Sequence, residues 1–205
     1  MRVLACFLVV FMVSCTDTIP PVIEVLPGSG EEHYRGLPYE DPGAIVLDDQ
    51  SCDTEEMLTV INEVDIWQYG SYTVTYTATD MSNNTATAIR EVDILLRPDD
   101  YYDLTWNATD TCEGIAFNYT ALVQDCDCDS FAITVGNISN FGLSALFTLP
   151  LDGSYNELVL MDTTKSGVTF SGNAIMNPSA DTLTWTYTLS DGADTESCSA
   201  TWTKN

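Results

Sequence analysis

The stretch Gly70-Ser71-Tyr72-Thr73-Val74-Thr75-Tyr76-Thr77-Ala78-Thr79-Asp80 decides the fold of the chain around it. Its larger apolar side chains occupy alternate positions, and threonines fill most positions between them. Strict alternation of this kind is typical of a β-strand that buries one face. The residues that follow, Asp80-Met81-Ser82-Asn83-Asn84, tolerate a tight backbone and predict a turn. A strand is therefore expected up to Asp80, with its partner strand beginning after Asn84.

Further apolar segments on both sides extend this strand into a β-domain. They lie at residues 22–26, 45–47, 58–64 and 85–95, and Pro20-Pro21 gives the domain a stiff entry. Arg97-Pro98-Asp99-Asp100 then breaks the pattern with a proline and two acidic residues, which is typical of a domain boundary. We expect residues 20–97 to form one β-domain.

Several of these stretches together resemble a bacterial immunoglobulin-like module. They are Pro20-Pro21-Val22-Ile23, Asp41-Pro42-Gly43-Ala44, Gly70 to Tyr76, and Asp80 through Asn84-Thr85-Ala86. The region is similar to the Ig-like domain of pesticidal crystal proteins and to the related HYR repeats. It departs from them at Asp48-Asp49-Gln50-Ser51-Cys52-Asp53, where the family's acidic loop has a glycine. The resemblance implies a β-sandwich that serves as a spacer or adhesive domain and has no catalytic residues.

Residues 101–205 predict a second β-domain. About eight short apolar-alternating segments follow one another with close turns, such as Asp152-Gly153 and Asp191-Gly192, and none shows a helical period. An antiparallel meander of this size closes into a small barrel or packs as a sandwich, and both remain open. The expected fold class is thus all-β, an Ig-like β-sandwich followed by a second antiparallel β-domain.

Three stretches of this second domain resemble the C-terminal domains of Bacteroidota-type surface lipoproteins. They are Ile138-Ser139-Asn140-Phe141-Gly142, Phe170-Ser171-Gly172-Asn173-Ala174, and the run from Trp185-Thr186-Tyr187 through Asp191-Gly192 to Cys198. The resemblance implies a surface location and assigns no activity.

The N-terminus has the layout of a bacterial lipoprotein signal. Arg2 precedes an unbroken apolar run from Val3 to Val13, and Met12-Val13-Ser14-Cys15 resembles the lipobox cut by signal peptidase II. The run is shorter than the about 20 residues of a transmembrane helix. We predict a signal peptide at residues 1–14, a lipidated Cys15 and a tether at 15–19, which would make an outer-membrane lipoprotein, periplasmic or surface-facing. An ordinary secretory signal is the alternative.

The chain is strongly acidic. It has 31 Asp and Glu against 6 Lys and Arg, and its formal net charge is −25. Such a surface repels nucleic acid. No nucleic-acid partner is therefore expected. The expected partners are the membrane, through the lipid anchor, and a glycan or protein ligand.

The cysteines predict at least one disulfide. An exported chain meets an oxidising compartment, where disulfides form. Cys112 follows the first expected strand of the second domain and Cys198 begins the last, and these strands are neighbours in a closed meander. We therefore predict a Cys112–Cys198 disulfide. Cys126 and Cys128 would form a small ring, or one of them would pair with Cys52, which is the favoured free thiol.

One cluster suggests a metal site. The alternating aspartates Asp125, Asp127 and Asp129 resemble the first three ligand positions of a calcium loop. Ser130 stands where the loop needs glycine, and Gly136 stands where it needs glutamate. An acidic hairpin tip held by a disulfide is the favoured interpretation and a weak calcium site the alternative. No firm metal site and no other cofactor are expected.

Catalytic residues are not evident, and aromatic residues offer the best binding candidates. His33 is the single histidine, and no nucleophile elbow occurs, so we expect no enzyme. Five aromatics near strand ends or the domain boundary would face a ligand or fill a core: Trp67, Tyr69, Tyr101, Tyr102 and Trp106. The sequence predicts a non-enzymatic cell-surface lipoprotein acting as a binding or spacer module. The alternatives are a glycan-capture lipoprotein of a nutrient-uptake system and a structural or adhesive protein that contacts a partner protein.

Overall fold

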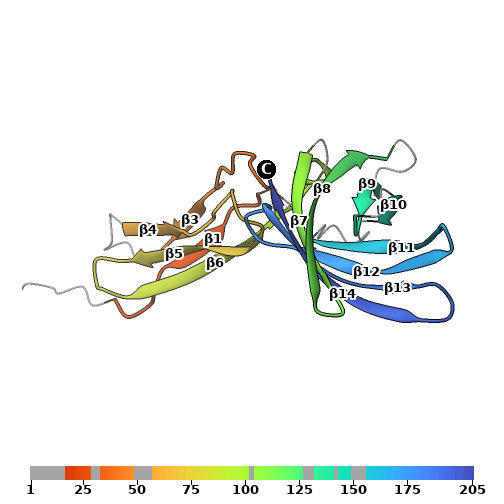
Figure 1. Ribbon diagram of the computed structural model, residues 1–205. Helices are drawn as coiled ribbons and strands as arrows, with labels where there is room; N and C mark the ends of the chain where they lie inside the picture. The colour runs from red at the N-terminus through yellow and green to blue at the C-terminus, as the bar shows by residue number, and fades with distance from the viewer. Residues whose placement is uncertain are drawn as a thin grey trace, which may run out of the picture. The chain divides into compact units, whose positions relative to one another are not determined.

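The computed structural model describes residues 17–28, 33–48, 57–101, 104–126, 132–140, 143–148 and 156–205. Within these ranges the chain forms β-strands and a single 3-10 turn, η1 (Pro98–Asp100), and contains no α-helix (Figure 1). The described residues fall into two compact units. The first contains residues 17–28, 41–48, 57–62 and 74–90, and the second contains the others. This division differs from the predicted boundary between residues 97 and 101, which stays a prediction.

Two sheets build the N-terminal half of the chain. The smaller sheet pairs β1 (Val22–Val25) with β3 (Ala44–Leu47) in antiparallel fashion. The larger sheet has the order β2-β6-β5-β4, and its bounds are β2 (His33–Tyr34), β4 (Met57–Asn62), β5 (Gly70–Thr79) and β6 (Thr85–Leu95). The strand predicted from the alternating residues 70–80 is β5. The two sheets confirm the expectation of an Ig-like arrangement.

The alternation in β5 separates a buried face from an open one. Val74, Tyr76 and Ala78 are fully buried, whereas the threonines between them are partly exposed. The Tyr76 hydroxyl donates a hydrogen bond of 2.6 Å to Asp41, and Arg90 of β6 forms an ion pair of 3.0 Å with the same carboxylate. A buried charge needs such a partner. The bonds fasten the segment that begins at Asp41 to β5 and β6.

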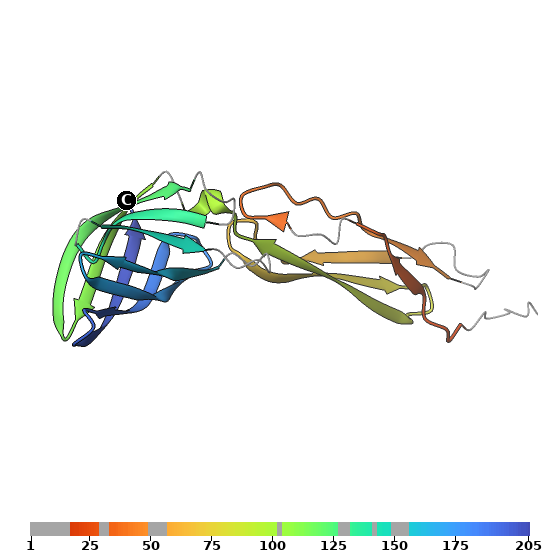
Figure 2. The ribbon, with the colours of Figure 1, turned by 90° about the vertical axis from the view of Figure 1, so that its right-hand side faces the viewer.

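The C-terminal half closes into an antiparallel barrel of eight strands (Figure 2). Their bounds are β7 (Leu104–Cys112), β8 (Ile115–Asp125), β9 (Ala132–Ile138), β10 (Leu143–Thr148), β11 (Glu157–Lys165), β12 (Val168–Met176), β13 (Thr182–Ser190) and β14 (Thr195–Lys204). Each strand pairs with the next along the chain, and β14 closes the barrel by pairing with β7. The structure thereby decides between the two predicted forms in favour of the barrel.

Aromatic side chains fill the interior of the barrel. Trp106, Phe147, Trp185 and Trp202 are all buried. The Trp185 ring lies 4.7 Å from that of Phe147 and 4.8 Å from that of Trp202, measured between centroids. Eight-stranded barrels have an interior that side chains can fill, and these buried rings contribute to that filling here.

A disulfide joins the first and last strands of the barrel. Cys112 of β7 lies directly opposite Cys198 of β14, and the two residues are bonded. The predicted pairing is therefore confirmed. Cys126 is also disulfide-bonded. Cys52 and Cys128 lie outside the described residues, so the free thiol expected at Cys52 stays a prediction.

Candidate binding site at one end of the barrel

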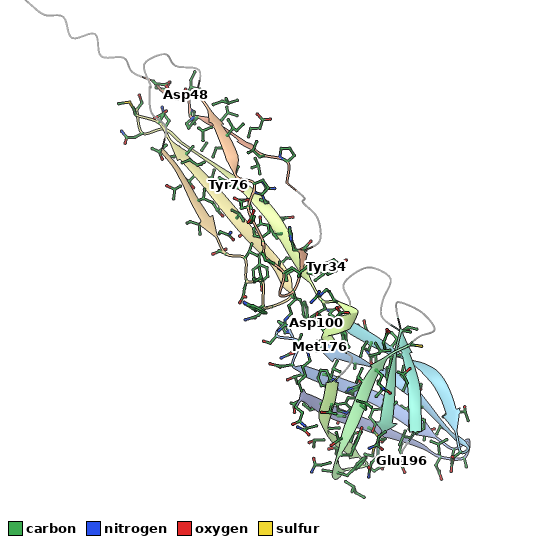
Figure 3. The ribbon with its side chains drawn as sticks, turned by 90° about the horizontal axis from the view of Figure 1, so that it is seen from above. Tyr34, Asp48, Tyr76, Asp100, Met176 and Glu196 are labelled. Carbon is green, nitrogen blue, oxygen red and sulfur yellow. A yellow bond between two sulfur atoms is a disulfide. The ribbon has the colours of Figure 1, made fainter. Side chains whose placement is uncertain are left out.

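The barrel has a pocket at the end where β7, β9 and β13 finish and where β8 and β14 begin. Its volume is about 210 Å³, and its lining residues come from all five strands or the turns beside them: Cys112, Phe117, Ser139, Asn140, Leu189 and Glu196. The antiparallel register sets Glu196 opposite Leu189. Figure 3 shows Glu196 at this end and Met176 at the other. We call this hollow the barrel-end pocket.

A buried carboxylate lies on β7, two residues before the pocket-lining Cys112. Asp110 of β7 is fully buried and accepts three hydrogen bonds from side chains. Tyr187 and Tyr119 donate to its Oδ2 over 2.6 and 2.9 Å, and Trp202 Nε1 donates to its Oδ1 over 3.2 Å. Buried polar groups need partners of this kind. These four residues form the Asp110 cluster.

Ser139 connects the Asp110 cluster to the barrel-end pocket. Its backbone N–H donates to the Tyr119 hydroxyl over 3.0 Å, and its Oγ lies 2.6 Å from the Tyr187 hydroxyl. Because Tyr187 gives its proton to Asp110, Ser139 is the donor in the second bond. Ser139 and Asn140 both adopt positive φ, in the left-handed region, so the turn after β9 is tight. A pocket-lining turn is thus held by the cluster.

The electrostatics of the Asp110 cluster follow from burial. Burial raises the pKa of Asp110, and the hydrogen bonds from Tyr187, Tyr119 and Trp202 oppose that rise. Burial, and next to it the Asp110 carboxylate, raise the pKa of Tyr119 and of Tyr187 far above the ordinary value. Both tyrosines therefore remain neutral donors. The cluster therefore acts through hydrogen bonds, which hold the Tyr119 and Tyr187 hydroxyls in position against Ser139.

The predicted aromatic candidates are not brought together. Tyr101 and Trp106 are fully buried, so the ligand-facing interpretation is wrong for both; Trp106 lies in the inward phase of β7 and donates to the Tyr101 carbonyl over 3.3 Å. Tyr69 packs against the barrel core, and its hydroxyl donates to the Met176 carbonyl over 2.8 Å. Trp67 is 61% exposed. Tyr102 lies outside the described residues.

The other predicted site residues are largely beyond the described ranges. Asp125 is exposed at the end of β8, whereas Asp127 and Asp129 lie outside the described residues, so the calcium-loop hypothesis stays untested. The same holds for lipidation at Cys15. His33 lies in β2 and packs edge-on against Tyr39, with the ring centroids 4.9 Å apart.

Sequence reasoning did not single out Asp110, although a signal exists. Trp106, Ala108, Asp110 and Cys112 share one phase of β7, and three of them are residues that normally face a core. A lone carboxylate in the apolar phase of a strand predicts a buried hydrogen-bonded group. Its partners come from β8, β13 and β14, and the spacing along the chain gives no indication of them.

The fold defines an all-β chain in which an Ig-like region precedes a closed eight-stranded barrel. Residues 33–94 match the family described as bacterial surface protein, Ig-like domain, which confirms the predicted module. No curated protein matches the chain. Among solved structures, the lipoprotein BT2262 from Bacteroides thetaiotaomicron is similar, with 15% identity, a TM-score of 0.38, and coverage of 88% of this chain and 98% of that one.

Across the described ranges, the structure contains no helix with the length and apolarity that a membrane crossing requires.

Proposed function

We propose that this chain is a lipid-anchored, non-enzymatic surface protein whose barrel binds a partner protein through the barrel-end pocket. Lipid on Cys15 holds it to the outer membrane, and the Ig-like domain is the spacer. The surface location is supported by the family match at residues 33–94. The binding role depends on one observation, the pocket of about 210 Å³ at one end of the barrel.

The lining of the pocket favours a small apolar group as the ligand. Phe117, Leu189 and the disulfide-bonded Cys112 supply apolar walls, while Asn140 and Glu196 supply polar groups. Pockets for drug-sized molecules measure about 300–1,000 Å³, so this one suits a single side chain. Hydrogen bonds of the Asp110 cluster fix the turn at Ser139, and a pre-organised pocket loses less entropy on binding.

Glycan capture is the second candidate, and the aromatics argue against it. Flat sugar faces stack on exposed aromatic rings. Of the five aromatic candidates, Tyr101 and Trp106 are buried and Tyr69 packs on the core, which leaves Trp67 exposed among the described ones. A single exposed ring provides no platform, so a protein partner is preferred.

Nuclear magnetic resonance on the ¹⁵N-labelled full chain tests the binding role. Short peptides with one central Leu or Phe, and separately a set of mono- and disaccharides, are titrated while amide shifts are followed. We expect peptide-induced shifts at Asn140, Leu189 and Glu196. The Phe117→Lys variant places a charge at the pocket and should abolish them. Ala116→Lys places the same charge on the exposed neighbouring position of β8 and should not.

Shifts from sugars alone, or peptide shifts that survive Phe117→Lys, would overturn the protein-binding proposal in favour of the glycan or spacer alternative.

The proposed lipid anchor is tested by a separate experiment. Cys15→Ala should release the protein from the membrane fraction or leave the precursor uncut. Absence of lipid mass on the wild-type N-terminal peptide would contradict the anchor.

A further inference from the structure

Three aspartates from distant parts of the sequence converge in the first unit. Asp17 precedes β1, Asp48 follows β3, and Asp80 follows β5. Each offers one carboxylate oxygen, and these oxygens all lie within 4.8 Å of one another. Figure 3 shows Asp48 at the end of the Ig-like strands. We call these residues the aspartate trio.

Strand pairing explains why the trio meets. Val22 at the start of β1 pairs with Leu47 at the end of β3, so the chain before β1 and the residue after β3 share one end of the small sheet. The turn after Asp80 reaches the same place, because the Asn84 side chain donates to the Asp17 carbonyl over 3.3 Å. The fold, and not a local motif, assembles the trio.

The second observation is an unsatisfied buried oxygen. Asp17 is 7% exposed, its Oδ1 accepts a bond of 2.9 Å from the Ile19 N–H, and its Oδ2 is buried without a hydrogen-bond partner among the described residues. Burying a carboxylate oxygen without a partner is strongly unfavourable. A cation bound by this oxygen would remove the penalty.

Positive side chains do not neutralise the two most buried members. In the part of the chain that the structure describes, no Lys or Arg forms an ion pair with Asp17 or Asp80. Both oxygens of Asp80 instead accept bonds of 2.7 Å from Asn84, one from its backbone and one from its side chain. These neutral donors hold the Asp80 carboxylate in place and leave its charge uncompensated. Carboxylates this close repel one another unless a cation lies between them.

From this geometry we propose that the aspartate trio binds a calcium ion. Calcium takes six to eight oxygen ligands at about 2.3–2.6 Å, so two oxygens on opposite sides of one ion lie up to about 5 Å apart. The observed limit of 4.8 Å fits this spacing. The trio contains no His or Cys, which zinc and copper sites use. Water and backbone carbonyls complete the coordination shell, which calcium tolerates in irregular geometry and magnesium does not.

The bound calcium fixes the N-terminal segment to the Ig-like domain. Asp17 lies before the first strand, and the ion joins it to the ends of β3 and β5. An ion that binds only the folded state stabilises that state by mass action. The link with the membrane rests on the proposed lipid anchor at Cys15, whereas the metal site does not depend on it.

Isothermal titration of the full chain, stripped of metal with EDTA and dialysed, tests the site with calcium chloride. We expect one Ca²⁺ per chain, weaker binding of Mg²⁺, and a melting temperature that rises with calcium. Asp17→Asn should weaken calcium binding by at least about tenfold, because one ligand charge is lost. Its amide oxygen still accepts the Ile19 N–H, so folding is preserved. Asp80→Asn should act likewise.

Two control variants make the result specific. Glu24→Gln removes one exposed carboxylate from β1 and should leave calcium binding unchanged. Asp125→Asn tests the separate acidic segment after β8. The proposal is overturned if wild type shows no calcium heat and no thermal shift, if Mg²⁺ binds as tightly, or if Asp125→Asn weakens binding while Asp17→Asn does not. Loss of the lipid anchor changes none of these outcomes, so failure of the site and failure of the anchor are distinguishable.

Discussion

Cys112 and Cys198 face each other across the seam of the barrel, with their Cα atoms 4.3 Å apart. They belong to β7 and β14, the first and last strands, so the covalent bond lies where the chain must close on itself. The bond spans 86 residues of sequence. A cross-link of that span removes much of the freedom of the unfolded barrel.

The first prediction is that this disulfide contributes strongly to stability. The double variant Cys112→Ala/Cys198→Ala should lower the free energy of unfolding by about 4 kcal/mol, as expected for a loop of this length. Urea unfolding monitored by tryptophan fluorescence measures the loss. Reductant on wild type is less selective, because Cys126 is also disulfide-bonded. A loss below about 1 kcal/mol would mean that the unfolded chain is already constrained at this seam.

The second prediction concerns the pH dependence that Asp110 confers. Burial raises its pKa in the folded state above the unfolded value of about 3.9. The folded state therefore binds the proton more tightly than the unfolded state. The stabilising contribution of Asp110 is fully present below the unfolded pKa and is lost as pH rises through the folded pKa.

Asp110→Asn removes this contribution, which gives a direct measurement. The stability of wild type relative to the variant should fall as pH rises from about 3 to 7. Chemical unfolding of both proteins at a series of pH values measures the difference. Asp125→Asn, which removes an exposed carboxylate from the adjacent strand, serves as the charge control. A relative stability that rises with pH would mean that the three hydrogen bonds outweigh burial.

The sequence predicts strands better than it predicts their closure. The alternation at Tyr72, Val74 and Tyr76 predicted β5 because a half-buried strand imposes that period. The same period occurs in barrels and sandwiches, so it left the architecture of residues 101–205 open. Closure depends on the pairing of β14 with β7, which alternation along either strand cannot encode. The Cys112–Cys198 pairing was predicted by assuming closure, and the disulfide observed between these strands agrees with it.

The candidate sites were harder to predict, for the same reason. Trp106 and Tyr101 were weighed as ligand-facing or core residues. The inward phase of β7 in the closed barrel buries Trp106, and the fold also buries Tyr101, which precedes that strand. Asp110 receives its partners from three other strands. The aspartate trio likewise meets because β1 begins where β3 and β5 finish. Sites assembled by strand register leave little signal in local spacing.

The third prediction concerns the buried ion pair of the Ig-like domain. Arg90 and Asp41 are largely buried, and Arg90 also donates to the Leu26 carbonyl over 2.7 Å. Arg90→Met should cost about 3–5 kcal/mol, because it leaves the Asp41 carboxylate buried without its counter-charge. Arg97→Met is the control. Its pair with Asp99 is 3.9 Å long and substantially exposed, so about 1 kcal/mol or less is expected. Equal losses in thermal unfolding would contradict the assignment.

The last prediction compares two tyrosines that each donate to a backbone carbonyl. The Tyr69 hydroxyl donates to Met176 over 2.8 Å in a partly buried place, and Tyr72 donates to Gln68 over 3.0 Å in an exposed one. Tyr69→Phe should cost about 1–2 kcal/mol, because the Met176 carbonyl loses a donor where water has limited access. Tyr72→Phe should change stability by less than about 0.5 kcal/mol, because solvent replaces the bond. Urea unfolding of both variants beside wild type measures the difference. Equal effects would show that the surroundings of Tyr69 are as open to water as those of Tyr72.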